Sequence, residues 1–380
     1  MALLHDWLLG MRGGERCLEL LCEMFPHADV FTLFYREGSV TRTIEEHFPE
    51  TSFLGKLPGV RRYYRALLPL FPSGVWDLGR RLSRRAHDEP YDLVISVSHC
   101  AVKNVSVPKE TRHLCYCLTP MRYIWDQYDA YFSKSPVEPL MRRVAHRLRE
   151  WDVSESKNVG QFIAISEYIA RRIERVYNRQ ALVIYPPVRT DWITPRREGE
   201  VGEGFLAVNA LVPYKNVELL VAAFNSLGEH LTIVGSGPGE RELKRNAGPN
   251  IKFVGSVTDA ELAELYRRSK ALVFAAEEDF GMAPVETQAA GRPVIALGRG
   301  GALETVNVSQ EIPTGVFFSE PTVASLTAAV RTFLDQEGRY TVDNCLRQAQ
   351  KFSAEEFQKK FFQVTNGTTV GNAEKTLAAL

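Results

Sequence analysis

The chain has 380 residues, which is enough for two or three domains of ordinary size. Lys plus Arg and Asp plus Glu both number 46, so the formal net charge is +0 and no global field attracts nucleic acid. Apolar residues make up 45%, and no apolar run approaches the roughly 20 residues that span a bilayer. We therefore expect a globular protein that binds no nucleic acid and contacts a membrane only peripherally.

The N-terminus and the cysteines indicate a cytoplasmic location. The opening run from Met1 to His5 has no basic region and few apolar residues, so we expect no secretory signal. The six cysteines lack the paired spacing of metal ligands. Two of them lie in the alternating run Cys115-Tyr116-Cys117, which is typical of a buried strand with reduced thiols.

The first half alternates short apolar strands with segments of helical period. A strand at Ala2–Leu4 leads through a glycine-containing loop, His5–Gly14, to a helix at Glu15–Phe25. Further strands are predicted at Val30–Phe34, Leu93–Val97, Leu114–Cys117 and Phe162–Ile165. This alternation is typical of a parallel sheet with crossover helices.

After Pro186 and a charged linker that ends near residue 203, the same pattern starts again. Strands are predicted at Phe205–Val208, Leu231–Val234, Ile251–Val254, Leu272–Phe274 and Pro293–Ala296, and helices at about Asn216–Leu227, Glu240–Ala247, Asp259–Ser269 and Ala283–Ala290. A last helix at Ala354–Phe362 follows Ser353, a suitable N-cap, and the tail from Thr365 should fray.

These patterns predict an α/β protein of two Rossmann-like domains. We expect residues 1–185 to form an N-terminal domain, joined by a C-terminal helix at 353–370, and residues 186–352 to form the second domain. Two such domains that face each other leave a cleft between the carboxyl ends of their strands, where open α/β sheets bind ligands.

Four neighbouring strand ends in the second half carry either glycine or a pair of glutamates. Gly235, Gly255 and Gly300 each follow a predicted strand. Glycine at a strand end lets a ligand approach the backbone closely. One such turn is a weak signal, but several at one sheet edge favour a ligand site.

The most informative motif is the run from Glu278 to Glu286, two glutamates that flank the turn between a buried strand and a helix. Carboxylates here can accept hydrogen bonds from hydroxyls, while the backbone N–H groups of residues 280–282 open a helix that can face an anion. A capped helix and a solvated side chain explain an isolated pair of this kind better. Lys215 precedes another helix, where a lysine opposes the helix dipole, so it is either a surface residue or a phosphate contact.

Taken together, the motifs resemble those of the family 4 retaining glycosyltransferases, and most of all the bacterial mannosyltransferases of surface polysaccharide or lipopolysaccharide assembly. The resemblance covers nearly the whole chain and runs, in order, through His5–Glu15, Cys115–Asp126, Phe162–Ser166, Tyr185–Val188, Ala210–Asn216, Val234–Pro238, Glu278–Glu286 and Gly300–Glu304. It implies the GT-B fold, in which two Rossmann-like domains face each other across a deep interdomain cleft.

The resemblance also implies roles for single residues. Glu286 would hold the ribose hydroxyls of the nucleotide, Glu278 would contact the transferred sugar, and Lys215 would stabilise the leaving diphosphate. The other residues implied at the nucleotide sugar are Gly13, Gly14, Gly235, Val254, Val257, Phe280, Gly281 and Met282. No cofactor is implied, because the nucleotide sugar is the substrate. No metal is implied either, because the chain lacks an Asp-x-Asp pair.

Two positions depart from the family pattern. Asn209-Ala210 stands where many members have an arginine, and Leu118 stands where a histidine often precedes Thr-Pro. Lys215 would then act alone at the diphosphate, or another cation would substitute for the arginine: Arg12, Arg122 or Arg299. The missing histidine leaves the rate and the sugar preference open.

The N-terminal half is expected to choose the acceptor. His99 ends a strand and is either an acceptor contact or a structural histidine, and Trp125 suits either sugar stacking or core packing. The predicted acceptor residues are His99, Arg122, Tyr123, Trp125 and Asp126. Residues 61–85 mix basic and apolar side chains, which is typical either of helices with solvated arginines or of a segment at an anionic membrane surface.

The sequence therefore predicts a retaining, metal-independent hexosyltransferase. It would move mannose from GDP-mannose to a saccharide or a lipid-linked saccharide, in the cytoplasm and in contact with the inner face of the plasma membrane. Three alternatives stay open: a glucosyltransferase that uses UDP-glucose, a nucleotide-sugar epimerase, and a catalytically degenerate subunit that binds nucleotide or a partner transferase.

Overall fold

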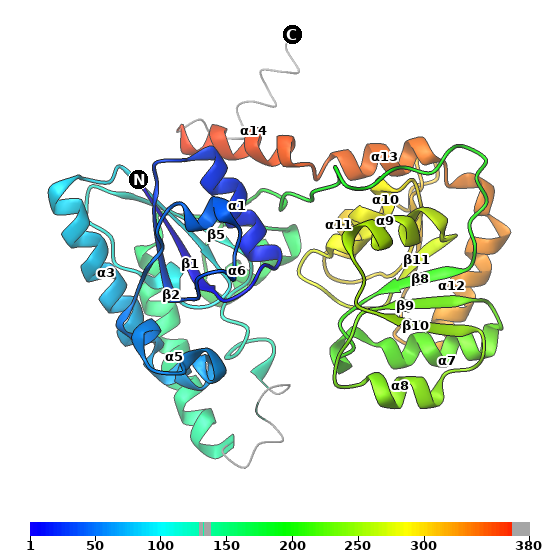
Figure 1. Cartoon of the computed structure of the whole chain (residues 1–380), viewed down its shortest axis with the longest axis horizontal. Helices are drawn as coiled ribbons and strands as arrows, with labels where there is room; N and C mark the ends of the chain where they lie inside the picture. The colour runs from blue at the N-terminus through cyan, green and yellow to red at the C-terminus, as the bar shows by residue number, and fades with distance from the viewer. Residues whose placement is uncertain (129–131, 133–137, 367–380) are drawn as a thin grey trace, which may run out of the picture. The chain divides into compact units, whose positions relative to one another are not determined.

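The computed structural model describes residues 1–128, 132 and 138–366. The chain divides into two compact units, Met1–Pro186 and Pro187–Leu380, each built on one parallel sheet (Figure 1). The predicted fold class, α/β with two Rossmann-like domains, is confirmed. That the helix at 353–370 belongs with the N-terminal domain stays a prediction, and its residues 367–370 lie outside the described part.

The N-terminal unit holds a seven-stranded sheet in the order β3-β2-β1-β4-β5-β6-β7. Its strands are β1 (Ala2–Leu8), β2 (Asp29–Tyr35), β3 (Glu50–Thr51), β4 (Leu93–Ser98), β5 (Arg112–Cys117), β6 (Gln161–Ala164) and β7 (Ala181–Val183). Its described α-helices are α1 (Gly13–Met24), α2 (Arg42–Glu45), α3 (Phe71–Asp88), α5 (Glu138–Glu155) and α6 (Glu167–Tyr177). Short 3-10 turns include η3 (Tyr64–Leu70) and η4 (Val102–Asn104).

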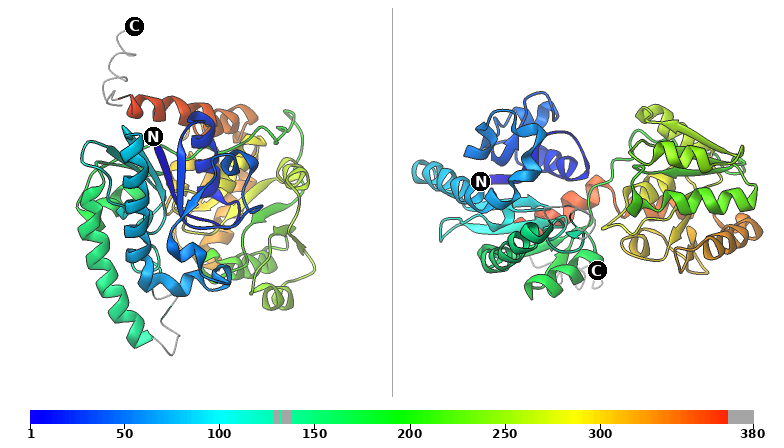
Figure 2. Two further views of the ribbon diagram at one scale, coloured as in Figure 1. Left: turned by 60° about the vertical axis from the view of Figure 1, so that its left-hand side comes forward. Right: turned by 90° about the horizontal axis from the view of Figure 1, so that it is seen from below.

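Helices α3 and α5 cover the same face of this sheet, as the left view of Figure 2 shows. Apolar side chains of both helices, such as Leu78 and Leu148, join Leu4 and Phe31 of the strands in one buried core. Burying a leucine or phenylalanine side chain stabilises a fold by about 1.5–3 kcal/mol, so this contact holds the two helices on the sheet.

The C-terminal unit holds a six-stranded sheet in the order β10-β9-β8-β11-β12-β13. Its strands are β8 (Phe205–Val208), β9 (Leu231–Val234), β10 (Ile251–Gly255), β11 (Ala271–Phe274), β12 (Val294–Leu297) and β13 (Gly315–Phe318). Its α-helices are α7 (Val217–Leu227), α8 (Glu240–Asn246), α9 (Asp259–Arg268), α10 (Met282–Ala289), α11 (Ala302–Thr305), α12 (Val323–Asp335), α13 (Val342–Gln350) and α14 (Ala354–Thr365).

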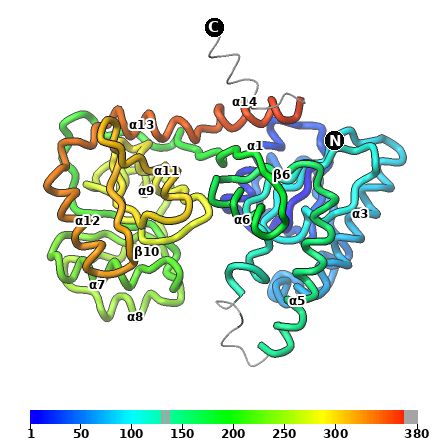
Figure 3. Tube along the Cα trace, turned by 180° about the vertical axis from the view of Figure 1, so that it is seen from behind, coloured from blue at the N-terminus to red at the C-terminus, as the bar shows by residue number. Residues whose placement is uncertain are grey.

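Helices cover both faces of this second sheet. Figure 3 shows α7, α8 and α12 on one side, and α9, α11 and α13 on the other, where α13 packs against α10. The strand order reverses between β8 and β11, which makes the carboxyl ends of these two strands the expected ligand site of the sheet.

The predicted boundaries around the first glycine loop are wrong. Strand β1 continues to Leu8, since His5 pairs with Thr32 and Trp7 pairs with Phe34 of β2. Helix α1 begins at Gly13, where the Glu15 carboxylate accepts a hydrogen bond from the Arg12 backbone N–H at 3.1 Å. The sequence pattern missed the strand extension because His5 and Asp6 are polar although both are fully buried.

The cysteine run at residues 115–117 is part of β5, as predicted, and all six cysteines are buried and unpaired. Burial raises the pKa of the Cys17 thiol to about 12, so this thiol stays protonated at neutral pH.

The buried His113 makes the stability of the fold depend on pH. Its Nε2 lies 2.9 Å from Ser96 Oγ and its Nδ1 lies 3.2 Å from the Asn158 carbonyl oxygen. Burial lowers the pKa of His113 from its ordinary value of 6.5 to about 4. The unfolded chain therefore binds the proton first, so stability present above pH 6.5 is lost as the pH falls towards 4.

We expect His113→Gln to remove about 3 kcal/mol of the change in unfolding free energy between pH 7 and pH 4. Urea unfolding at a series of pH values measures this change. The same substitution at the exposed His146 should leave it unaltered. Equal pH dependence in both variants would contradict the assignment to His113.

Candidate functional site

Lys215 and Glu278 form an ion pair at the carboxyl edge of the C-terminal sheet. Lys215 ends the turn after β8 and Glu278 follows β11, so the pair spans the point where the strand order reverses. The side chains are 14% and 25% exposed, which leaves part of each open to a ligand. The Asn216 amide donates to the Ala275 carbonyl oxygen at 2.9 Å and ties the two loops together. The structure thus brings the two predicted catalytic residues into contact.

The glycines after β12 hold the loop that carries Glu278. The Gly301 N–H donates to the Glu278 carbonyl oxygen at 2.8 Å. Gly300 has φ +61°, and a Cβ there would lie 2.4 Å from the same oxygen. A side chain at Gly300 would therefore displace this loop. Gly300 contributes to the site by close packing of backbone.

The start of α10 follows this loop directly. Gly281 precedes the helix with φ +87°, a conformation that favours glycine, and Met282 is its first residue. Phe280 is buried and its ring packs edge-on against Phe352, with 5.4 Å between ring centroids. What residues 280–282 can offer a ligand is therefore the backbone at a helix N-terminus, and their contact with a sugar or diphosphate stays a prediction.

Glu286 lies further along α10 and is held by a buried tyrosine. The Tyr266 hydroxyl of α9 donates to Glu286 Oε2 at 2.7 Å. Burial and the neighbouring carboxylate keep the pKa of Tyr266 well above its ordinary value, so Tyr266 remains a donor at neutral pH. This contact sets the position of the carboxylate that we expect to bind ribose hydroxyls.

A cavity of about 410 Å³ opens beside Lys215. Its lining residues are Val208, Asn209, Ala210, Tyr214, Lys215, Val234, Gly235 and Ser236. Asn209 is 6% exposed, and within the described residues neither Oδ1 nor Nδ2 of its amide has a hydrogen-bond partner. A buried amide without a partner costs about 1–3 kcal/mol, which makes Asn209 a candidate ligand contact.

Sequence reasoning missed Asn209, because it treated this position only as the place of a missing arginine. A polar residue that directly follows a buried strand was the signal available in the sequence. Gly235 lies against the same residue, since it has φ +123° and a Cβ on it would lie 1.9 Å from the Asn209 carbonyl oxygen. Gly235 therefore shapes this cavity by its close approach to Asn209.

Val254 and Val257 line a second groove of the C-terminal unit. This groove, of about 730 Å³, lies between the strands β8 to β10 and helix α9. Both valines are half-buried and present apolar surface there. Such surface suits the face of a nucleobase, and that role stays a prediction.

In the N-terminal unit, Asp6 of β1 organises the loop after β4. Its carboxylate accepts hydrogen bonds from four successive backbone N–H groups, those of residues 99–102, at 2.6 to 2.9 Å. Asp6 Oδ2 also lies 3.2 Å from His99 Nδ1. Burial acts to raise the pKa of Asp6, but the two imidazoles nearby and these N–H groups outweigh it and lower the pKa.

This contact orients His99. Burial lowers the pKa of His99 to about 4, so its imidazole is neutral at pH 7. Because Asp6 lies beside Nδ1, Nε2 is the ring nitrogen left to contact a hydroxyl. The side chain is 17% exposed. The geometry fits an acceptor contact, which stays a prediction, and adds Asp6 as a residue that sequence reasoning missed.

Gly13 and Gly14 open α1 above His5. A Cβ on Gly14 would lie 2.7 Å from Leu118 Cδ1 and 3.2 Å from His5 Cε1, so a side chain there would push the tip of Leu118 aside. His5 is fully buried, and neither ring nitrogen forms a hydrogen bond with any described residue. Its Nε2 lies 3.8 Å from Glu15 Oε1. The leucine at position 118 thus packs under the glycines that we expect to cover the phosphates.

The predicted acceptor cluster of residues 122–126 does not form one surface. Tyr123 is 8% exposed and packs near Trp7, with 6.4 Å between ring centroids. Trp125 Nε1 donates to Asp152 at 2.9 Å, and Asp126 forms an ion pair with Arg172 at 2.5 Å. Arg122 lies close enough to His99 to help lower its pKa. The indole N–H and the carboxylate are thus bound within the protein.

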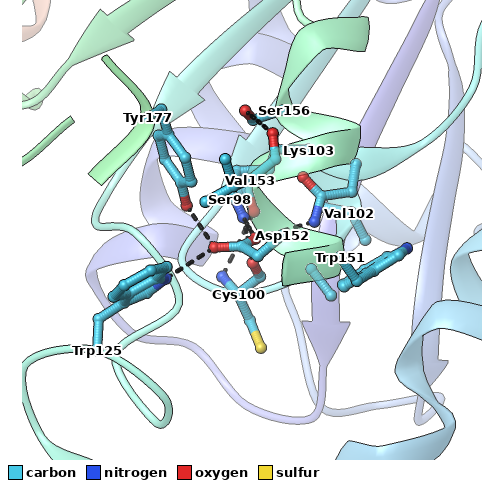
Figure 4. Close-up of polar contacts among 12 residues, drawn as sticks. Ser98, Cys100, Val102, Lys103, Trp125, Trp151, Asp152, Val153, Ser156 and Tyr177 are labelled. Carbon is cyan, nitrogen blue, oxygen red and sulfur yellow. Dashed lines mark hydrogen bonds and ion pairs between the residues drawn. The ribbon is translucent and has the colours of Figure 1, made fainter. Parts of the chain in front are cut away.

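Asp152 of α5 is the centre of a buried polar network (Figure 4). Its carboxylate accepts hydrogen bonds from Lys103 Nζ at 2.5 Å, Asn104 Nδ2 at 2.9 Å, Trp125 Nε1 at 2.9 Å and the Tyr177 hydroxyl at 2.8 Å. Lys103 is also fully buried and donates to the Cys100 carbonyl oxygen at 2.8 Å. The network joins the loop that carries His99 to the segment that carries Trp125 and to α6.

Replacing Asp152 by asparagine should destabilise the protein by about 3–5 kcal/mol, because it leaves the Lys103 charge buried without a counterion. Urea unfolding measures this loss. The double variant Lys103→Met/Asp152→Asn should lose less than the sum of the two single variants, since the unpaired charge is gone. Glu46→Gln breaks a solvent-exposed pair and should change little. Strictly additive losses would contradict the pairing.

Within the part of the chain that the structure describes, no group of three or more His, Cys, Asp or Glu side chains is placed to hold a metal ion. Among the same residues, no helix combines the length and the apolar character needed to cross a bilayer.

The fold and the site define a class of protein: two Rossmann-like units, with a charged pair and a partly polar cavity at the switch point of the second sheet. The solved glycosyltransferase WaaG shares this fold, with a TM-score of 0.64 at 14% identity over 97% of this chain and 100% of that chain. The structure of HepE from Anabaena in complex with UDP superposes with a TM-score of 0.70 at 19% identity, over 96% of this chain and 100% of that chain. The GT-B fold predicted from the motifs is thereby confirmed.

Residues 189–352 match the model of the family "Glycosyl transferases group 1". Sulfoquinovosyl transferase SQD2 of Arabidopsis thaliana is 29% identical over 321 residues, which cover 80% of this chain and 62% of that protein. A GDP-mannose-dependent alpha-(1-6)-phosphatidylinositol monomannoside mannosyltransferase of Mycobacterium tuberculosis is 30% identical over 233 residues, 53% of this chain and 57% of that protein. The chain thus spans about three fifths of the length of these curated relatives.

Proposed function

We propose that the protein is a retaining, metal-independent hexosyltransferase that uses a nucleotide sugar and a saccharide or lipid-linked saccharide acceptor. The observation that carries this proposal is the cavity beside Lys215, in which a cation and the unpartnered amide of Asn209 meet at the switch point of the sheet. A cation and an amide donor suit a diphosphate. The adjacent Glu278 and Glu286 supply carboxylates for sugar and ribose hydroxyls.

Different residues of the C-terminal unit then contribute to activation of the donor. Lys215 compensates the charge that develops on the leaving diphosphate, and the backbone at the start of α10 adds a helix N-terminus to it. The bond from the anomeric carbon to the diphosphate breaks while the acceptor oxygen bonds to the same face of that carbon. The acceptor proton passes to the departing phosphate oxygen, so the protein needs no nucleophile of its own.

Mannose from GDP-mannose is our first donor candidate, because a relative at 30% identity carries that donor in its name. Glucose from UDP-glucose is the second, because the relative SQD2 transfers sulfoquinovose, a sulfonated glucose. We place the reaction in the assembly of a surface polysaccharide or lipopolysaccharide, at the cytoplasmic face of the plasma membrane.

A thermal-shift screen tests the donor assignment. GDP, UDP and ADP, each with EDTA present, should raise the melting temperature by different amounts. The nucleotide that gives the largest rise identifies the base of the donor. GDP is expected to give the largest rise. No shift with any nucleotide would contradict nucleotide-sugar binding. A shift that appears only when EDTA is left out would contradict metal independence.

Product analysis separates the remaining alternatives. With donor alone, an epimerase converts the nucleotide sugar, whereas a transferase only hydrolyses it slowly. A protein that binds nucleotide but transfers nothing across a broad panel of donors and acceptors would be the degenerate subunit.

We also propose peripheral contact with an anionic membrane through residues 61–85. Trp76 is 64% exposed and Leu70 is 45% exposed, and the Arg80 guanidinium lies 4.8 Å from the centre of the Trp76 ring. Arg81 and Arg85 pair with carboxylates and are less suited to lipid headgroups. Trp76→Glu should reduce sedimentation with anionic vesicles, and neutral vesicles should bind the parent chain weakly. Equal binding of parent and variant would contradict this contact.

A further inference from the structure

A separate cavity, of about 190 Å³, lies in the N-terminal unit beside His99. Its lining residues are Trp7, Arg65, Ala66, Leu68, Phe71, Tyr123 and Phe132. Arg65 and Ala66 of η3 are exposed and form the mouth, whereas Leu68 and Phe71 are almost fully buried and form the floor. The cavity adjoins the candidate acceptor contact, because the Trp7 ring meets the His99 ring edge-on at 4.3 Å between centroids.

The lining favours an apolar group. Among the described residues, the lining apart from Arg65 consists of aromatic and aliphatic side chains. A sugar ring would bring several hydroxyls into this space, and each hydroxyl left without a partner would cost about 1–3 kcal/mol. A cavity of about 150 Å³ lined by apolar side chains is large enough to bind benzene. The space beside His99 therefore accommodates an apolar group of about five or six carbons.

The mouth of the cavity favours an anion. Arg65 lines the cavity, and Arg61 and Arg62 precede it in the chain by four and three positions; all three are exposed. The Arg65 guanidinium lies 5.1 Å from the centre of the neighbouring Tyr64 ring. Arginine is well suited to phosphate.

We propose that this cavity binds the first carbons of an apolar chain that carries a phosphate, with the phosphate held at Arg65. The proposal rests on the proposed glycosyl transfer and names its acceptor class: a short lipid-phosphate-linked saccharide. Because the cavity and His99 share Trp7, the hydroxyl that reacts lies within one or two sugar rings of the lipid. The protein then adds a sugar near the lipid end of a growing chain, where a lipid carrier already loaded by an earlier transfer is the substrate.

Titration calorimetry with monomeric dodecyl phosphate, on the full chain and without donor, tests the site. Ala66→Trp fills the mouth and should weaken binding at least tenfold, and Arg65→Gln should weaken it several-fold. Ala66→Ser and Arg171→Gln, a surface arginine of α6, should stay within twofold of the parent chain. Melting temperatures show whether each variant is folded, and Ala66→Phe replaces Ala66→Trp if that variant is not.

The competing ligands decide what the cavity recognises. Inorganic phosphate should bind at least tenfold more weakly than dodecyl phosphate, and dodecyltrimethylammonium should also bind more weakly. Equal binding of inorganic phosphate would overturn the apolar part of the proposal, and equal binding of the cationic detergent would overturn the phosphate part. Unchanged binding to Ala66→Trp would overturn the site itself.

These measurements need no donor, so their failure leaves the proposed glycosyl transfer intact. Loss of nucleotide binding in the thermal-shift screen would instead remove that function while the lipid-phosphate site stood. With a working donor, Ala66→Trp should raise KM for a lipid-phosphate acceptor, whereas the control Arg171→Gln should not. Equal KM values for the variant and the parent chain would overturn the assignment of this cavity to the acceptor.

Discussion

Replacing Glu286 by alanine should abolish the rise in melting temperature that a nucleoside diphosphate produces. Each hydrogen bond from a ribose hydroxyl to a carboxylate contributes about 1.5–3 kcal/mol, so losing two weakens binding by roughly 100-fold or more. At a nucleotide concentration that saturates the parent chain, the variant would then be largely unliganded. Thermal denaturation with and without nucleotide measures the difference.

Tyr266 provides the control for this prediction. Its hydroxyl donates to Glu286 at 2.7 Å, so the alanine variant also leaves a buried hydroxyl without a partner. Tyr266→Phe removes that hydroxyl but keeps the carboxylate, and it should retain most of the nucleotide-dependent shift. If Glu286→Ala keeps the full shift, the assigned role of Glu286 is wrong. If both variants lose the shift equally, Glu286 acts by holding α9 against α10.

Lys215 and Glu278 should have opposite effects on nucleotide binding and the same effect on transfer. Lys215→Met removes the cation that compensates the leaving diphosphate, and we expect kcat to fall by roughly 100- to 1,000-fold. Nucleoside diphosphate should also bind more weakly. Glu278→Gln removes the carboxylate that pairs with Lys215, so it should bind nucleoside diphosphate as tightly as the parent chain or more tightly. It should still lose transfer, because Glu278 is expected to hold the sugar.

Calorimetry with the nucleoside diphosphate and with the complete nucleotide sugar, followed by initial-rate measurements, separates these effects. Lys244→Met is the matched control, since Lys244 pairs with Glu240 on the surface of α8 and should alter neither binding nor rate. A Glu278→Gln variant that binds the diphosphate much more weakly would contradict the division of roles between the two residues.

Much of the fold could be predicted from the sequence, because its strands are short and apolar. Runs such as Leu231–Val234 and Leu93–Val97 are buried on both faces in a parallel sheet, and they appear as continuous apolar segments. Only the first half of strand β1 could be predicted, because Asp6 is a charged residue at a buried position. No apolar pattern marks such a residue, since its burial is made tolerable by donors from β4 and the loop after it.

Lys215, Glu278 and Glu286 of the candidate donor site were predicted from the sequence, because they lie in motifs that resemble those of a known family. The residues that contact them in the structure could not be predicted from the sequence. Tyr266 is 20 positions from Glu286, and Asn209 has a side chain whose lack of a partner is visible only once the packing is known. The cluster predicted at residues 122–126 is the opposite case, in which neighbours in the sequence separate in the structure. Trp125 binds Asp152 of α5, whereas Asp126 binds Arg172 of α6.

The sequence by itself determined the two-domain α/β organisation and the residues that mark the second sheet's carboxyl edge, because strand periodicity and motif order are local properties of the chain. Only the tertiary structure decided which charges are buried and what they hold. Lys103 and Asp152 lie 49 positions apart, and each taken alone is an ordinary surface residue type. Their burial follows from packing α5 and α6 against the N-terminal sheet, which removes water from both charges at once and leaves each as the other's counterion.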